Sequence, residues 1–396
     1  MSPTIKPVKM TAQEAVECAK SLAPRIRERS AEAESLRRMP EKTIQEFVES
    51  GLVRLMQPLR WNGHELGFDA LVSTAIEIGK ACGSSGWCHS VLAIHFWMMS
   101  LFPEQAQQEV WSKRSDTLIG TAVAPAGQPT RVDGGFRLGG NWPFASGIDY
   151  CEWVILGGLL PPREGGHPEM RFFLVPKQDY KIDDTWYAAG LRGTGSSNVV
   201  LDNVFVPEHR TVSTKDLGEG NSPGAAVNTA PLYRLPLLAL FPFTLVGPAI
   251  GAALGALEAW RERSRSRRSA LTGAPFAEMV ATHMRLGEAA AEIDCAELLV
   301  RRDIDDVMKT VTAGEKVPPG VRARTLRDAA YATRLCVRAV DGLFEASGGH
   351  GLYDKNPIQR AWRDVHAMSA HVALSWDTAS ENFGRMEFGL PSKLPF

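Results

Sequence analysis

The chain has 396 residues, a formal net charge of −1, and ordinary fractions of apolar and charged residues. At roughly 100–200 residues per domain, this length predicts two or three domains, each able to bury a core. The near balance of charge gives no overall field that would attract nucleic acid or a membrane surface, so we expect neither partner.

The six cysteines show no CxxC pair and no metal-ligand spacing, which predicts reduced structural thiols and no metal centre. No apolar run looks long enough to span a bilayer, and the N-terminus lacks the hydrophobic core of a signal peptide. Together these features predict a cytoplasmic protein.

Residues 1–115 predict an N-terminal helical domain. Thr11 and Glu14 have the spacing of a capping box, in which each side chain bonds to the other residue's backbone N–H at a helix start. Residues 68–80 and 87–101 are apolar enough to form buried helices. We find no strand pattern in this part of the chain.

Residues 116–225 differ in character and predict a middle β domain. Short runs rich in valine, isoleucine and aromatic residues alternate with glycine-containing turns. The runs that predict strands lie at residues 117–123, 136–138, 153–157, 170–175 and 198–206. Their spacing indicates a compact antiparallel sheet, and the polar, glycine-containing span 214–230 indicates a loop or linker.

Residues 226–396 predict a C-terminal bundle of long antiparallel helices. The clearest segment covers residues 321–344, where apolar positions recur every three or four residues and define one buried face. Residues 245–260 and 276–311 supply two further long helices, which favour a four-helix bundle. The predicted fold class is therefore α+β multidomain, with helices first, then a small sheet, then the bundle.

Three motifs in this layout resemble the acyl-CoA dehydrogenase superfamily. Residues 190–197 read GLRGTGSS and are followed at residues 200–207 by VLDNVFVP, a long and therefore specific match. Phe144-Ala145-Ser146-Gly147 has the order of aromatic, spacer and hydroxyl residue that the superfamily places beside its flavin. Residues 347–351, SGGHG, resemble its glycine-rich turn before the last long helices. The resemblance extends over nearly the whole chain and implies the acyl-CoA dehydrogenase fold.

The glutamate that acyl-CoA dehydrogenases use as a base has no counterpart here. Eight positions beyond Asp364 the chain has Val372, and the alternative position on an earlier helix falls in residues 237–243, which contain no acid. His371 stands beside Val372, and we expect it on the same helix as Asp364. Dehydrogenase chemistry therefore lacks its base.

The helix pattern Trp362-Arg363-Asp364 followed by His371 resembles the oxygenase components of two-component flavin-dependent monooxygenases. That group includes hydroxyphenylacetate hydroxylase and secosteroid phenol hydroxylases. Gly86-Trp87, His95 and residues 142–147 (WPFASG) extend the match. The resemblance implies an enzyme that takes up reduced FMN or FAD from a separate flavin reductase and adds O₂ at flavin C4a. The resulting hydroperoxide would hydroxylate a small aromatic, phenolic substrate, in a homotetramer.

This resemblance also implies three catalytic side chains, Ser146 beside flavin N5, His95 and His371. With an ordinary pKa of ~6.5, His371 could take a phenolic proton near neutral pH. His95, His371, Thr121 and Phe241 are the expected substrate contacts. A turn serine and a structural histidine in a helix are the competing interpretations of Ser146 and His371.

We expect the flavin ring to lie against Trp142 and Phe144, and its phosphate to be held by arginines and loop hydroxyls. The candidates for the phosphate are Arg192, Ser196, Ser197, Arg263 and Arg267. A core position for the tryptophan and a solvated helix end for the arginine run at residues 261–268 are the competing interpretations.

Three other functions share parts of the pattern. A flavin N- or S-oxygenase of the same fold would share Ser146 and His371. An acyl-CoA dehydrogenase or oxidase is disfavoured by Val372 and by the missing earlier acid. A flavin-free binding protein would have no reason to keep His95, Ser146 and His371 together.

Overall fold

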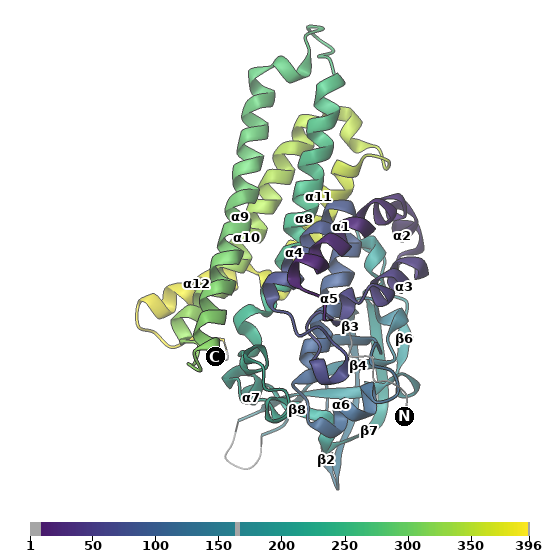
Figure 1. Cartoon of the computed structure of the whole chain (residues 1–396), viewed down its shortest axis with the longest axis vertical. Coiled ribbons are helices and arrows are strands. Elements are labelled where there is room, and N and C mark those ends of the chain that lie inside the picture. The colour runs from purple at the N-terminus through teal and green to yellow at the C-terminus, as the bar shows by residue number, and fades with distance from the viewer. Residues whose placement is uncertain (1–8, 163–166, 395–396) are drawn as a thin grey trace.

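The computed structural model describes residues 9–162 and 167–394, and its elements form three successive parts (Figure 1). Residues 68–100 of the N-terminal part lie between the sheet and the long helices of the C-terminal part. This arrangement confirms the predicted order of helices, sheet and bundle. The boundaries proposed at residues 115/116 and 225/226 stay a prediction.

The N-terminal part begins at the predicted capping box. The Glu14 N–H donates to Thr11 Oγ1 at 3.2 Å, and the Thr11 N–H donates to the Glu14 carboxylate at 2.7 Å. The α-helices described in this part are α1 (Ala12–Glu28), α2 (Ser30–Leu36), α3 (Glu41–Glu49), α4 (Phe68–Ala81), α5 (Gly83–Ser100) and α6 (Glu104–Trp111). The two predicted buried helices correspond to α4 and α5.

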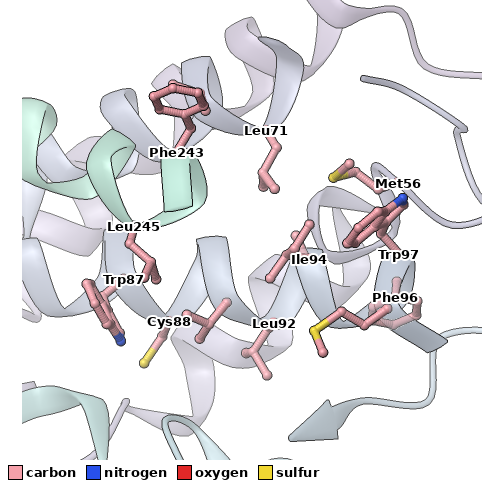
Figure 2. Close-up of a cluster of buried hydrophobic side chains, with 14 of the residues drawn as sticks. Met56, Leu71, Trp87, Cys88, Leu92, Ile94, Phe96, Trp97, Phe243 and Leu245 are labelled. Carbon is pink, nitrogen blue, oxygen red and sulfur yellow. The ribbon is translucent and has the colours of Figure 1, made fainter. Parts of the chain in front are cut away.

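Every residue of α5 is buried, so this helix forms the centre of the molecule. Figure 2 shows Leu92 and Ile94 of α5 in one hydrophobic cluster with Leu71 of α4 and with Leu245 of α8 (Leu237–Ser266). Gly86 lets α5 approach α4 closely, because a Cβ there would lie 2.7 Å from the Cα of Gly79. The close crossing fixes the start of α5.

The described residues of the middle part form one eight-stranded sheet with the order β6-β7-β3-β1-β4-β5-β8, and β2 pairs with β3. The strands are β1 (Ile119–Gly127), β2 (Thr130–Val132), β3 (Gly135–Ala145), β4 (Trp153–Leu160), β5 (Glu169–Pro176), β6 (Lys181–Asp183), β7 (Ser197–Pro207) and β8 (Thr211–Ser213). The prediction of an antiparallel sheet is wrong in one place, because β1 and β4 pair in parallel. Alternation within a strand does not reveal which distant strand it pairs with or in which direction. The loop predicted at residues 214–230 also differs, since it begins with the short helix α7 (Thr214–Glu219).

The C-terminal part contains α8, α9 (Val280–Thr312), α10 (Pro319–Ser347), α11 (Pro357–Ser369) and α12 (Trp376–Glu387). Helix α10 packs against α8, α9 and α11, and α8 also contacts α9 and α11, which confirms the four-helix bundle. Leu326 and Val340 lie buried on the predicted face of α10. Helix α8 extends from the bundle onto α4 and α5, so the two helical parts share one core (Figure 1).

Helix α8 corrects the expectation that no apolar run could span a membrane. By length and composition alone it could do so, but 83% of its most apolar window is buried inside the protein. Packing against α4, α5 and α10 accounts for this apolar character.

Candidate active site

Trp87, near the start of α5, contacts two of the side chains that are predicted to be catalytic. Its indole Nε1–H donates to the hydroxyl oxygen of Ser146 at 3.0 Å. Its ring meets the imidazole of His371 edge-on, with 5.7 Å between the ring centres and 61° between the ring planes. The structure therefore brings Ser146 and His371 to the same tryptophan.

The Ser146 hydroxyl belongs to a chain of hydrogen bonds that leads into the glycine-rich loop before β7. Ser146 Oγ lies 2.7 Å from Ser196 Oγ, which lies 2.6 Å from Thr194 Oγ1. Thr194 donates in turn to the backbone carbonyl of Leu191 at 3.0 Å. The Gly147 N–H donates to the Thr194 carbonyl at 2.9 Å and joins the two loops a second time. The turn after β3 and the glycine-rich loop thus form one connected unit, which we call the hydroxyl chain.

Helix α11 holds the glycine-rich loop in place. A Cβ on Gly190 would lie 2.0 Å from the carbonyl oxygen of Arg363, so only glycine fits there. One carboxylate oxygen of Asp364 accepts from the N–H of Leu191 at 2.7 Å, and Leu191 has a left-handed φ of 52°. Burial raises the pKa of the Asp364 carboxyl to about 7. The Arg-Asp pair therefore positions the loop that carries the hydroxyl chain.

His95 and Thr121, both predicted to contact substrate, bond to each other. His95 Nε2 lies 2.7 Å from Thr121 Oγ1, and Nδ1 lies 2.6 Å from the carbonyl oxygen of Ile119. A carbonyl only accepts, so Nδ1 carries the hydrogen and Nε2 accepts from the threonine hydroxyl. Burial lowers the pKa of His95 to about 4, which keeps the ring neutral at pH 7. Thr121 is only partly buried and is the accessible end of the pair.

His371 departs from the prediction in two respects. Helix α11 ends at Ser369 without a glycine or proline to mark the end, so His371 lies beyond it and caps the next turn. Its Nδ1 accepts from the N–H of Ala373 at 3.2 Å, and burial lowers its pKa to about 4. A neutral ring whose Nδ1 accepts carries its hydrogen on Nε2. In this arrangement the neutral His371 ring can donate through Nε2, and its role as a proton acceptor stays a prediction.

The two aromatic residues expected against the flavin have different environments. Phe144 is 68% exposed and has a left-handed φ of 69°, an uncommon conformation for a bulky residue. Trp142 is fully buried, and its Nε1–H donates to the carbonyl of Gly157 at 2.6 Å. The pairing of β3 with β7 shifts register between Trp142 and Ala145, so simple alternation fails here. We therefore assign Trp142 to the core of the sheet in place of the predicted flavin contact.

Two of the predicted phosphate-binding arginines flank the C-terminal end of α10. Arg192 is exposed and lines a cavity of about 300 Å³. The cavity is also lined by Phe344, Leu352, Trp362 and Arg363. Arg267 donates to the carbonyl of Ala346, in the last turn of α10, at 2.9 Å. Arg263 is partly buried near the end of α8, while Ser196 and Ser197 are buried at the start of β7.

The positions of a dehydrogenase base hold no carboxylate in the structure either. Val372 is 80% exposed on the turn after His371, and the first turns of α8 contain no acid. Phe241, a predicted substrate contact, is partly buried in those turns. The positions where a dehydrogenase needs an ionised acid are therefore occupied by apolar side chains.

Comparisons with known proteins identify the family of this chain. The family model of the acyl-CoA dehydrogenase N-terminal domain matches residues 9–115, and that of the acyl-CoA dehydrogenase C-terminal domain matches residues 243–376. The chain is 39% identical over 373 residues to the flavin-dependent monooxygenase oxygenase subunit HsaA of Rhodococcus jostii, covering 94% of this chain and 97% of that protein. This chain belongs to the oxygenase subunits of flavin-dependent monooxygenases.

Two further relatives support membership of this monooxygenase family. The oxygenase component of the FADH₂-dependent resorcinol hydroxylase from a Rhizobium strain is 35% identical over 381 residues, which cover 94% of this chain and 93% of that protein. The crystal structure of 3-HSA hydroxylase from Rhodococcus sp. RHA1 has a TM-score of 0.92 at 37% identity, and the match covers 96% of this chain and 98% of that one. The predicted fold and enzyme class are confirmed.

The roles of single residues in this monooxygenase stay predictions. The sequence alone assigns no role to two residues of the site, Trp87 and Thr194. Trp87 was recognised only through the Gly86-Trp87 pattern, and Thr194 only as a member of the glycine-rich motif. An indole N–H on a buried helix needs an acceptor, and that need was the available signal for Trp87.

Proposed function

We propose that this oxygenase subunit takes a reduced flavin from a separate reductase and uses it with O₂ to hydroxylate a small phenolic ring. The observation that carries the proposal is the position of two hydrogen-bonded pairs on one buried helix. One pair is Trp87 with Ser146, and the other is His95 with Thr121. Trp87 and His95 are eight residues apart on α5, which is about 12 Å along the helix axis. The Trp87–Ser146 pair is suited to contact a flavin, and the His95–Thr121 pair is suited to bind a phenol.

The residues around Ser146 fit a flavin. The Ser146 hydroxyl can bond to a ring nitrogen without adding charge, and the exposed ring of Phe144 offers an aromatic face. Arg192 and Arg267 are suited to the phosphate end because guanidinium groups bind phosphate oxygens well. When bound, the reduced flavin would supply the electrons that activate O₂.

Thr121 is suited to orient the phenol. Its hydrogen goes to His95 Nε2, so its oxygen is left to accept from a phenolic O–H. His95 is held in turn by the carbonyl of Ile119, which keeps the threonine hydroxyl in one orientation. His371 offers an Nε2–H, and we propose that it donates to an oxygen atom of the bound reactants. This role replaces the proton removal expected from an ordinary histidine pKa.

The proposal includes two kinds of partner. A flavin reductase would supply the reduced flavin, in keeping with the oxygenase-subunit and oxygenase-component names of the relatives. The predicted homotetramer would use the C-terminal helices, where Val280, Met284 and Leu298 of α9 are exposed apolar side chains.

Reconstitution tests the proposed function. The protein is combined with a flavin reductase, NADH and FAD or FMN, and offered a panel of phenols together with an amine and a thiophene. We expect hydroxylated product from phenols, and only while reduced flavin is supplied. Conversion of the amine or thiophene without any phenol would instead establish N- or S-oxygenation. Oxidation of an acyl-CoA by a tightly bound oxidised flavin would contradict the proposal outright.

A further inference from the structure

The two ends of the hydroxyl chain fix the direction of every hydrogen bond within it. The indole Nε1 of Trp87 can only donate, and the carbonyl oxygen of Leu191 can only accept. Each hydroxyl between these ends has a single hydrogen. Thr194 uses its hydrogen on Leu191, so it accepts from Ser196. Ser196 has then used its own hydrogen, so it accepts from Ser146.

This order leaves Ser146 without a free hydrogen. Its O–H points to Ser196, and one of its two lone pairs accepts from Trp87. One acceptor position on the oxygen remains. Thr194, Ser196 and Ser146 are all buried, so the chain is shielded from water that could reverse its direction.

We propose that Thr194 and Ser196 orient the Ser146 hydroxyl so that the site selects a reduced flavin over an oxidised one. The inference rests on the proposed function, which places Ser146 beside flavin N5. A reduced flavin carries an N–H at N5 and can donate to the remaining acceptor position of Ser146. An oxidised flavin has a bare N5 that needs a donor, so Ser146 would have to turn its hydrogen away from Ser196 and lose that bond.

Such selectivity suits a subunit that receives its flavin already reduced. The oxidised flavin left after turnover would leave readily, and free oxidised flavin would compete poorly for the site. Thr194 and Ser196 are positioning residues, because they act through the hydroxyl of Ser146.

The experiment compares the dissociation constants of reduced FAD, measured without oxygen, and oxidised FAD for the full-length protein and for Thr194→Val. Valine keeps the shape of threonine, and the Leu191 carbonyl still accepts from the Trp186 indole at 2.9 Å. Without the threonine oxygen, Ser196 can turn its hydrogen toward Ser146, whose own hydrogen becomes available. We expect oxidised FAD to bind roughly tenfold more tightly to the variant, the worth of one hydrogen bond, with little change for reduced FAD. Thr194→Ser should restore the original ratio.

Thr333→Val is the matched control. Thr333 is also buried and donates to a backbone carbonyl, that of Ala329 at 3.0 Å, but it lies within α10. Both constants should be unchanged in this variant. An unchanged ratio in Thr194→Val, or equal weakening of both forms, would overturn the inference and leave flavin use intact. If Ser146→Ala alters neither constant, Ser146 is not beside the flavin. If the wild type binds neither redox form of FAD and neither redox form of FMN, the proposed function fails as well.

Discussion

The indole nitrogen of Trp87 lies 3.0 Å from the hydroxyl oxygen of Ser146, a bond between residues 59 positions apart in the chain. It joins the central helix of the N-terminal part to the turn after β3. The close crossing of α4 and α5 at Gly86 sets the position of the tryptophan, so the site depends on core packing. A small shift of α5 would therefore disturb Ser146 directly.

Replacing Trp87 tests whether this bond matters for function. Trp87→Phe keeps an aromatic ring and removes the donor to Ser146, so the serine hydroxyl loses one of its anchors. We expect reduced flavin to bind more weakly by a factor corresponding to about 1 kcal/mol and the ratio of H₂O₂ to hydroxylated product to rise. The control is Trp97→Phe, since Trp97 lies on the same helix (Figure 2). Its indole N–H donates to the Leu232 carbonyl at 2.9 Å, away from Ser146. Equal product ratios in the two variants would show that the Ser146 bond has no role.

The Thr121 hydroxyl should matter for the substrate and not for the flavin. Thr121→Val removes the oxygen that His95 Nε2 keeps in place, so the phenolic O–H loses its acceptor. We expect kcat/KM for the phenol to fall roughly tenfold while the dissociation constant of reduced flavin stays the same. Thr121→Ser keeps the hydroxyl and should keep most of the activity. Unchanged kcat/KM in the valine variant would exclude Thr121 as a substrate contact.

Phe144 offers a case in which stability and binding should change in opposite directions. Glycine adopts the left-handed φ of this position without strain, so Phe144→Gly should be at least as stable as the wild type in urea unfolding. Loss of the exposed ring should weaken flavin binding several-fold. Leu271→Gly removes a side chain that is 97% exposed and should leave flavin binding unchanged. Full flavin affinity in Phe144→Gly would contradict the predicted contact.

The buried His95 should make stability depend on pH. Its pKa is about 4 in the folded protein and ~6.5 when unfolded, so the unfolded chain binds more protons between these values. The contribution of neutral His95 to the free energy of unfolding is complete above pH 6.5 and is lost as the pH falls toward 4. We expect His95 to account for about 2 kcal/mol of the decrease in the free energy of unfolding between pH 7 and pH 5. His95→Gln should show a fall smaller by that amount in urea unfolding, and a fall as large as that of the wild type would contradict this role of His95.

Helix positions could be predicted because they depend on local pattern. The capping box at Thr11, the buried helix at residues 68–80 and the apolar face of α10 are each contained in one short segment. The glycine-rich motif could be recognised for the same reason, and the structure adds that Gly190 is required by the nearby carbonyl of Arg363.

The features that escaped prediction depend on contacts between distant segments. The parallel pairing of β1 with β4 and the register shift that separates Trp142 from Phe144 both involve strand partners that no local pattern identifies. The pKa of His371 is lowered by burial, and its tautomer follows from the bond to Ala373. The direction of the hydroxyl chain likewise requires both of its ends to be known.

A single-turnover reaction in ¹⁸O₂ is the most direct test of the proposed activity. The protein is mixed without oxygen with reduced FAD or FMN and with the phenol that gives most product in the reconstitution, then exposed to ¹⁸O₂, and the product is analysed by mass spectrometry. We expect one ¹⁸O atom in each hydroxylated product, and from His371→Ala we expect O₂ consumption with H₂O₂ release but little product. Hydroxylated product without ¹⁸O, or equal product yields from the wild type and His371→Ala, would contradict the proposed use of this site.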